Sequence, residues 1–336
     1  MRFGIIGTNF ISREFVRAGR RLDGFSVAAV CSRAEETARG FAQAEACPEA
    51  RCLAGTDALA ACPDVDAVYI ASPNSCHAAQ TEQMLLAGKH VLLEKPACPD
   101  RGTFERLAAL ARERGVVLLE AMRPAFIPGF LALAQAAREL GPVRRASFSY
   151  CQYSSRYDKF KAGIVENAFN PALCNGALMD IGVYCAHALV SLFGPPDGVL
   201  AVAQKLHNGL DAQGGALCIY PGMLADLSYS KIADGRRTNE LQGEEATLLI
   251  DSITNPKKII RIDRRGESAV VYEDPDPEFF GMAHEIAAFM RYAQAARGGA
   301  RPWEAHNRTT AQTLGLLDEI RRQTGIDFQH GEEATL

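Results

Sequence analysis

Short apolar runs alternate with amphipathic helical patterns along the first 122 residues. The runs that read as strands are 2–6, 25–31, 64–70, 91–94 and 116–120. Helical spacing of apolar residues occurs at 11–20 and 77–87, and again between Asp100, a predicted N-cap, and Gly115, a predicted stop. Strands that alternate with helices at these lengths build a parallel sheet with helices on both faces. The sequence therefore predicts a doubly wound α/β domain at residues 1–122.

The pattern changes after residue 122, where one helix at 130–140 precedes a series of strand-like runs. These runs are 145–153, 199–206, 216–220, 223–230, 238–242, 247–250, 258–262 and 269–272. Two later helices are expected, one with an apolar stripe over 279–290 that includes Phe279, and one at 307–323. A chain of 336 residues exceeds what one core usually organises. We therefore expect a second domain at 123–336, an α+β fold with a large, mainly antiparallel sheet whose open face forms a homodimer.

Composition excludes several classes of function. The net charge is −4 with acids and bases interspersed, which argues against a nucleic-acid groove or a membrane surface as partner. The ten cysteines include no Cys-x-x-Cys pair and no histidine at zinc spacing, so we expect neither a disulfide framework nor a metal site. We see no signal peptide and no apolar run of membrane-spanning length. A soluble, cytoplasmic protein that acts on a small molecule is the expectation.

The turn after the first strand resembles a dinucleotide-binding fingerprint. It reads Gly7-Thr8-Asn9-Phe10-Ile11-Ser12, where the fingerprint has Gly-x-Gly-x-x-Gly. Gly7 serves the tight turn, and Ser12 is small enough for helix–strand packing. Asn9 stands where the backbone approaches a pyrophosphate, and asparagine tolerates the positive φ expected there. This turn makes the first domain a Rossmann-type nucleotide-binding domain, with residues 7–11 as cofactor contacts.

The end of the second strand indicates which cofactor is bound. NAD-binding chains usually place an acid there, whereas this chain reads Cys31-Ser32-Arg33. A hydroxyl and a guanidinium suit a 2′-phosphate, so NADP is favoured over NAD. The alternative is that Arg33 stacks on the adenine or is solvated.

Two more strand ends carry polar groups toward the same edge. Ser72, Pro73 and Asn74 follow the third predicted strand, and His77 opens the next helix near the cofactor, where we expect a capping or surface role. The run Val91–Pro96 ends in Glu94-Lys95-Pro96. Ligands of parallel sheets bind outside the carboxyl ends of the strands, so Lys95 should face the cleft, with Glu94 fixing it. The alternative is a solvated Glu–Lys pair.

A third polar constellation lies between the first two long strands of the second domain. If the chain is helical from Leu178, then Asp180, Tyr184 and His187 share one stripe. The alternative is a buried helix whose aspartate is a cap and whose tyrosine bonds a carbonyl. Four further polar residues could bind a polyol or an acid group, or are ordinary surface residues: Arg123, Arg156, Lys161 and Asn170.

These motifs together resemble the Gfo/Idh/MocA family of oxidoreductases. The resemblance rests on the Gly7 turn, Pro73-Asn74, Glu94-Lys95-Pro96 and the segment 176–184. Tyr184, where many members have histidine, is similar to the glucose–fructose oxidoreductase and dihydrodiol dehydrogenase branch. The departures are Asn9, Ser12, Asn175 and the stretch 122–125, and the last alters a pocket wall. The resemblance implies hydride transfer between NAD(P) and a secondary alcohol of a sugar, polyol or vicinal diol.

The chemistry assigns roles to three residues. Oxidising an alcohol requires a base, and a free tyrosine titrates near 10, roughly three units too high at neutral pH. The ammonium of Lys95 would favour the phenolate of Tyr184, and Asp180 would accept a hydrogen bond from a second hydroxyl. His187 is the alternative base. A catalytically silent NAD(P)-binding sensor and a redox-assisted glycoside-cleaving enzyme are the alternative functions.

Overall fold

The computed structural model describes residues 1–276 and 281–328. By their contacts, these residues form two compact units. The first comprises 1–123 and 281–311, and the second comprises 124–276 and 312–328. Each unit is described by itself.

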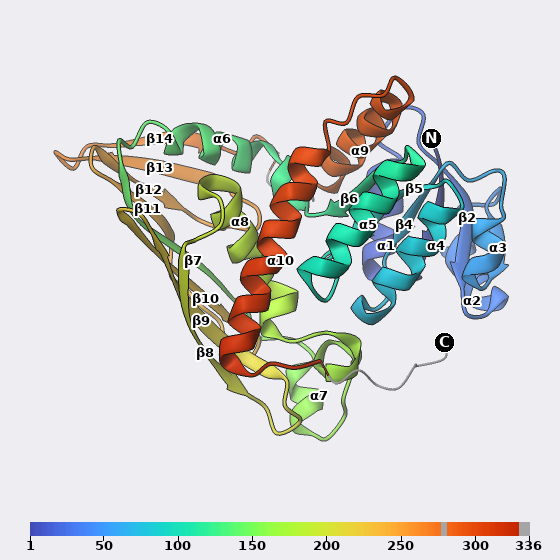
Figure 1. The fold of residues 1–336 in the computed structure, drawn as a ribbon, viewed down its shortest axis with the longest axis horizontal. Coiled ribbons are helices and arrows are strands. Elements are labelled where there is room, and N and C mark those ends of the chain that lie inside the picture. The colour runs from blue at the N-terminus through green and yellow to red at the C-terminus, as the bar shows by residue number, and fades with distance from the viewer. Residues whose placement is uncertain (277–280, 329–336) are drawn as a thin grey trace. The chain divides into compact units, whose positions relative to one another are not determined.

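The first unit is built on a six-stranded parallel sheet in the order β3-β2-β1-β4-β5-β6 (Figure 1). The strands are β1 (Arg2–Ile6), β2 (Ser26–Ser32), β3 (Arg51–Ala54), β4 (Ala67–Ile70), β5 (His90–Glu94) and β6 (Leu118–Ala121). This is the predicted doubly wound sheet. The edge strand β3 was not predicted, because it has only four residues and all of them are partly or fully exposed.

The helices of this unit pack on the sheet and on one another. They are α1 (Phe10–Gly19), α2 (Glu35–Ala44), α3 (Thr56–Ala60), α4 (His77–Leu86), α5 (Arg101–Arg114) and α9 (Met282–Arg297). Helix α1 packs against α9, and α4 packs against α3 and α5. Asp100 caps α5 through the Thr103 N–H, and Gly115 ends it at φ 68°, as predicted. By its contacts α9 belongs to this unit, although the sequence pattern grouped it with the second half; Phe279 lies outside the described residues.

The second unit contains the predicted large sheet, with eight strands in the order β14-β13-β12-β11-β7-β10-β9-β8. The strands are β7 (Val143–Cys151), β8 (Gly198–Lys205), β9 (Asp211–Tyr220), β10 (Met223–Ser230), β11 (Asn239–Gly243), β12 (Ala246–Ile250), β13 (Lys258–Asp263) and β14 (Ser268–Glu273). Neighbouring strands are antiparallel except for β7 and β10, which are parallel. All eight runs predicted for this sheet are strands.

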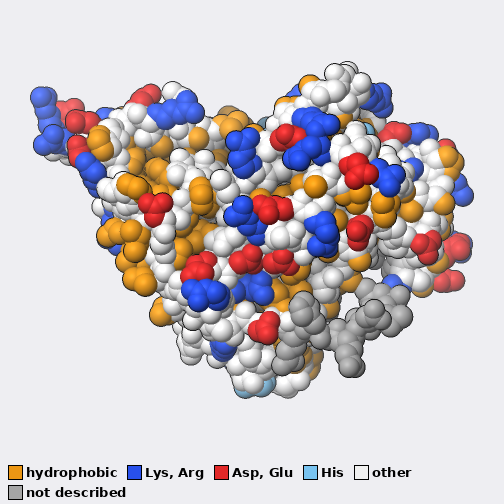
Figure 2. All heavy atoms as spheres, in the orientation of Figure 1, with side chains coloured by type: hydrophobic (Ala, Val, Ile, Leu, Met, Phe, Trp, Pro, Cys, Tyr) orange, Lys and Arg blue, Asp and Glu red, His pale blue; other side chains and the backbone are white. Residues whose placement is uncertain are grey.

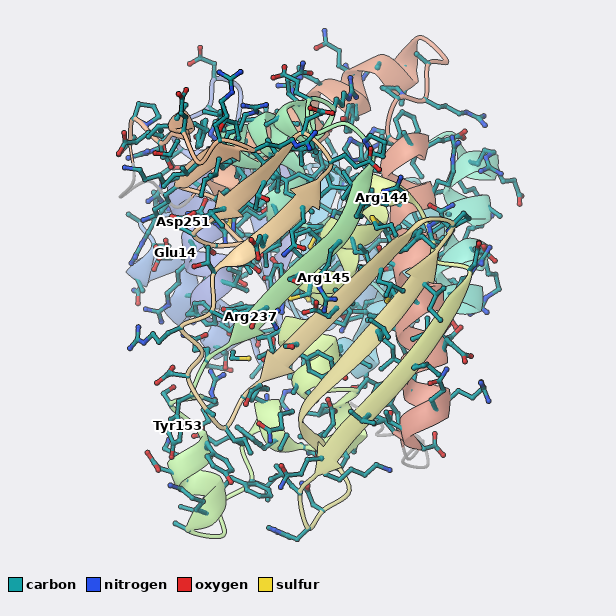
Figure 3. The ribbon with its side chains drawn as sticks, turned by 90° about the vertical axis from the view of Figure 1, so that its left-hand side faces the viewer. Glu14, Arg144, Arg145, Tyr153, Arg237 and Asp251 are labelled. Carbon is teal, nitrogen blue, oxygen red and sulfur yellow. The ribbon has the colours of Figure 1, made fainter. Side chains whose placement is uncertain are left out.

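The helices of this unit include α6 (Pro128–Ala137), α7 (Tyr157–Lys161) and α8 (Val183–Phe193), and α10 (Glu304–Thr324) ends in this unit. Two of them, α6 and α8, pack on one face of the sheet. Helix α8 packs against β7 and β10, and α6 packs against β13 and β14. The other face of the sheet is turned toward the viewer in Figure 3, and Figure 2 shows hydrophobic side chains gathered over the strands of this unit.

One segment of this unit is long and apolar enough to span a membrane, which the sequence analysis did not anticipate. It is Pro171–Phe193, with a mean hydropathy of 1.5 in its most apolar window. Because 72% of that window is buried inside the structure, it has the character of a core helix.

Candidate active site

The turn between β1 and α1 requires glycine at residue 7. Gly7 has φ +99°, and a Cβ at this position would lie 2.5 Å from the carbonyl oxygen of Ala71, just beyond β4. Strands β1 and β4 are the neighbours at which the strand order reverses. Ligands of open parallel sheets bind at this switch point, so the turn lies where a dinucleotide would bind.

Asn9 has a different structural role from the one predicted. Its φ is −85° and its backbone is extended, so the expected positive φ is wrong. Its side-chain oxygen instead caps α1 by accepting the N–H groups of Ile11 and Ser12 at 3.1 and 3.2 Å. Its side-chain nitrogen donates to the Ala71 carbonyl at 2.8 Å. Asn9 therefore fixes the start of α1 to the end of β4, and Ser12 is fully buried beneath it.

The end of β2 exposes a positive charge. Cys31 is buried, Ser32 is half-buried and Arg33 is exposed. The guanidinium of Arg33 acts to lower the pKa of Cys76, which burial nevertheless raises above its usual value. Arg33 therefore lies near the 3₁₀ turn Asn74–Cys76 that follows β4. This edge offers a hydroxyl and a guanidinium but no carboxylate at the strand end, which fits a 2′-phosphate.

His77 joins two of the loops at this edge. It is fully buried, and no side-chain cap is found at the start of α4, so the expected capping or surface role is wrong. Its Nδ1 lies 3.0 Å from the Pro96 carbonyl oxygen and its Nε2 lies 3.1 Å from that of Ser72. Burial lowers its pKa to about 4, so the ring is neutral at physiological pH and donates to one of these two carbonyls. His77 thereby ties the loop after β4 to the turn that carries Lys95.

Glu94 is held beneath that turn. Its carboxylate accepts the Tyr69 hydroxyl at 2.6 Å and the backbone N–H of Lys95 at 3.2 Å. Burial raises the pKa of Glu94, while the bond from Tyr69 and the charges of Lys95 and Arg123 oppose that effect. Glu94 therefore binds the backbone at Lys95, the residue expected to face the ligand.

Further buried carboxyl groups lie in the first unit, among them Glu120 and Glu285, and neither of these two was singled out from the sequence. Glu120 accepts the Ala97 N–H and the Thr310 hydroxyl, each at 2.9 Å, and burial raises its pKa to about 7. Glu285 on α9 is fully buried, neither of its oxygens has a hydrogen-bond partner among the described residues, and its pKa is raised well above the usual value by burial. Glu285 could have been noticed in the sequence, because it is an acidic residue next to the apolar stripe predicted for α9.

In the second unit, Asp180 and Tyr184 lie on consecutive turns. The chain is helical from Leu178, but its first turn, Leu178–Gly182, is a π-helix that continues as α8. π-Helical turns are often found at functional sites. Asp180 and Tyr184 are half-buried, and the Tyr184 ring contacts that of Tyr150 on β7 edge to face, with centroids 5.8 Å apart.

His187 has a different environment from the two residues before it. Only 3% of it is exposed, and its Nδ1 lies 3.3 Å from the Ser191 hydroxyl. Asp180, by contrast, has 35% of its side chain exposed. His187 is buried, whereas Asp180 and Tyr184 are partly exposed. This difference favours Tyr184 over His187 as the residue that contacts the substrate.

Asp211 fixes the start of the π-helical turn. Its Oδ2 accepts the Leu178 N–H at 2.6 Å, and burial raises its pKa to about 6. Gly176 has φ +130°, and any Cβ there would overlap the Asp211 carboxylate. The glycine in this motif is therefore required both by its own backbone and by the close approach of Asp211.

The other polar residues singled out from the sequence are engaged with the protein. Arg156 pairs with Glu166 at 3.4 Å, and Lys161 pairs with Asp158 at 2.7 Å. Asn170 caps a short 3₁₀ turn by accepting the Ala172 N–H at 3.1 Å. Arg123 ends the first unit, where its charge acts on Glu94 and Glu285. Within the described ranges, no group of three or more His, Cys, Asp or Glu residues could hold a metal ion.

Two protein-family models match this chain. Residues 1–122 match the family described as "Oxidoreductase family, NAD-binding Rossmann fold", and residues 132–249 match the "GFO/IDH/MocA C-terminal domain". The chain is 40% identical to scyllo-inositol 2-dehydrogenase (NADP(+)) of Bacillus subtilis (strain 168), over 98% of both chains. It is 27% identical to trans-1,2-dihydrobenzene-1,2-diol dehydrogenase of Bos taurus, again over 98% of both chains.

Solved structures show the same likeness. The chain is similar to KijD10, a 3-ketoreductase from Actinomadura kijaniata solved in complex with NADP and TDP-benzene, with a TM-score of 0.83 and 27% identity. The match covers 96% of this chain and 98% of the ketoreductase.

Proposed function

The chain belongs to the Gfo/Idh/MocA family of NAD(P)-dependent oxidoreductases, and from this premise we propose that it oxidises a cyclic polyol of the inositol type with NADP. The family, the fold class, the enzyme class and the NADP preference predicted from the sequence are confirmed. The observation that carries the finer substrate proposal is the 40% identity to a scyllo-inositol 2-dehydrogenase over 98% of both chains.

The first unit has the features that NADP binding requires. Gly7 allows the tight turn between β1 and α1 to pass close to the Ala71 carbonyl, and the N-terminus of α1 favours a phosphate through its dipole. We propose that Thr8, Asn9, Phe10 and Ile11 line the pyrophosphate, and that Ser32 and Arg33 bind the 2′-phosphate. Five residues at the neighbouring strand ends complete the proposed cofactor site: Ser72, Pro73, Asn74, Glu94 and Lys95. His77, which was also expected to contact the cofactor, is proposed instead to hold the loops that carry Ser72 and Lys95.

The second unit supplies the groups for the substrate. When bound, the nicotinamide accepts or donates the hydride. Tyr184 is proposed to remove the hydroxyl proton, since a phenolate can act as the base when a cation stabilises it, and Lys95 is proposed to provide that charge. Asp180 is proposed to accept a hydrogen bond from a second hydroxyl. Solved structures of the ketoreductase include variants in which a lysine or a tyrosine is replaced; these are the residue types proposed here.

A substrate panel tests the proposal. Purified protein is incubated with scyllo-inositol, myo-inositol, glucose and a trans-dihydrodiol, each with NADP⁺ and with NAD⁺, while the absorbance of the reduced nicotinamide is followed. We expect the highest kcat/KM with an inositol and NADP⁺. Turnover of the dihydrodiol alone would refute the inositol proposal, and the absence of turnover in both directions would favour the silent sensor. Release of a cleaved sugar without net cofactor reduction would favour glycoside cleavage.

We also propose that the enzyme is a cytoplasmic homodimer that pairs through the open face of the large sheet. Four exposed apolar residues on this face support the proposal: Leu200, Val202, Ile219 and Leu224. The register of β8, β9 and β10 puts them on the same side as Arg145, which Figure 3 shows on the exposed face of β7. A contiguous exposed apolar surface of this kind usually marks an interface.

A further inference from the structure

We infer that Lys231, a buried lysine outside every sequence motif, is a positioning residue that holds the Asp180 carboxylate in place to receive a substrate hydroxyl. The inference rests on the role proposed above for Asp180. Its basis is an ion pair in which Lys231 Nζ lies 2.8 Å from Asp180 Oδ2. The two side chains are unequally exposed, 4% for Lys231 and 35% for Asp180. The cation is therefore inside the unit while the carboxylate reaches its surface.

The ammonium group of Lys231 has three further interactions that fix it. It donates to the Ala168 carbonyl at 3.0 Å and lies 4.9 Å from the centre of the Phe169 ring. Its charge also acts on Asp211, where it opposes the rise in pKa that burial causes. A buried ammonium is tolerated only when such partners replace its lost hydration. Lys231 therefore has little freedom to move relative to the turn that carries Asp180.

The backbone at Lys231 is anchored as well. Its N–H donates to the Ala212 carbonyl at 2.9 Å, and its own carbonyl accepts the Ser154 N–H at 2.9 Å. Lys231 follows directly after β10, the strand next to β9 in the sheet. Lys231 therefore links the Asp180 carboxylate to the sheet through a few hydrogen bonds. The π-helical turn fixes only the backbone of Asp180, so without Lys231 its side chain could adopt several rotamers.

An ion pair of this kind has a distinct kinetic signature. Asp180 is proposed to bind a hydroxyl that does not react, so it contributes about equally to the ground state and the transition state. Loss of its orientation should raise KM and leave kcat nearly unchanged. Misplacement of a binding group by about 1 Å can reduce efficiency about 10²-fold. A purely structural role for Lys231 would instead lower the amount of folded enzyme without changing KM.

The test compares four variants of the full-length enzyme with the polyol that wild type turns over fastest. In Lys231→Met we expect KM for the polyol to rise about 10- to 100-fold, with kcat within about threefold and the Kd for NADP⁺ unchanged. Lys231→Arg, which keeps the charge, should recover part of the loss. Asp180→Asn should show the same rise in KM, and the double variant Lys231→Met/Asp180→Asn should be no worse than the poorer single variant, because both substitutions remove one interaction.

Lys89→Met is the matched control, because the Lys89 ammonium, like that of Lys231, donates to backbone carbonyls. Its acceptors are those of Cys62 and Val65, each at 2.7 Å, in the first unit. It should leave KM for the polyol unchanged. Additive losses in the double variant, or a wild-type KM in correctly folded Lys231→Met, would overturn the inference. Failure of the wild-type enzyme to turn over any polyol would instead overturn the proposed function, so the two failures are distinguishable.

Discussion

The buried carboxyl group of Glu120 makes the stability of the protein depend on pH in a calculable way. Burial raises its pKa from 4.5 to about 7. The folded protein therefore holds this proton more tightly than the unfolded chain does. Below pH 4.5 the carboxyl group is mostly protonated in both the folded and the unfolded state. As the pH rises from 4.5 to 7, the unfolded chain loses this proton while the folded protein keeps it, so the free energy of unfolding falls progressively. The difference between the two pKa values, at about 1.4 kcal/mol per pKa unit, corresponds to about 3 kcal/mol.

Glu120→Gln removes the charge and preserves the shape. The amide oxygen can still accept the Ala97 N–H, and the amide nitrogen can donate to the Thr310 hydroxyl. Relative to wild type, the variant should gain about 3 kcal/mol in the free energy of unfolding between pH 4.5 and pH 8. Glu45, Glu94 and Glu285, the other buried carboxyl groups described in this unit, are present in both proteins, so their contributions largely cancel in the comparison.

Urea unfolding followed by circular dichroism at the two pH values measures this difference. The control is Glu113→Gln, which neutralises an exposed carboxylate on α5 of the same unit and should change the free energy of unfolding by about 0.5 kcal/mol or less at either pH. Parallel pH dependence in Glu120→Gln and wild type would refute the reasoning, since it would mean that the pKa of Glu120 is the same in the folded protein and in the unfolded chain.

Three other substitutions test separate parts of the structure. Arg33→Ala should weaken NADP binding by about 1–3 kcal/mol and leave NAD binding nearly unchanged in a fluorescence titration; equal losses would indicate stacking on the adenine. Gly7→Ala should abolish cofactor binding, because its Cβ would lie 2.5 Å from the Ala71 oxygen, whereas Gly88→Ala, at φ +73° in open space, should lose only about 1 kcal/mol of stability. Val202→Asp, at a residue 74% exposed, should shift the light-scattering mass from dimer to monomer; an unchanged mass would place the interface elsewhere.

The sequence predicted those features that depend on local residue patterns. The Gly7 turn was predictable because only glycine readily adopts its backbone conformation, and the α5 caps were predictable because Asp100 and Gly115 are typical of helix ends. The role of Asn9 was misjudged because a residue type that tolerates positive φ also caps helices, and the sequence does not distinguish the two.

The features that were missed depend on contacts between distant parts of the chain. Lys231 meets Asp180 only because β10 and the π-helical turn pack together, and nothing near either residue in sequence indicates the pair. The π-helical turn itself has no known signal in the residues Leu178–Gly182. His77 was expected to have a capping or surface role at the start of a helix, yet the loops after β4 and β5 enclose it.

The measurement that tests the central claim most directly is the single-turnover rate of hydride transfer in Tyr184→Phe. This substitution keeps the ring contact with Tyr150 and removes only the hydroxyl, so the fold and the affinity for NADP⁺ should be unchanged. The account predicts a rate about 10²- to 10⁴-fold below wild type, the usual contribution of general acid–base catalysis, and a loss at least as large in Lys95→Met. A near-normal rate in Tyr184→Phe, together with loss of hydride transfer in His187→Asn, would contradict it and assign the base to His187.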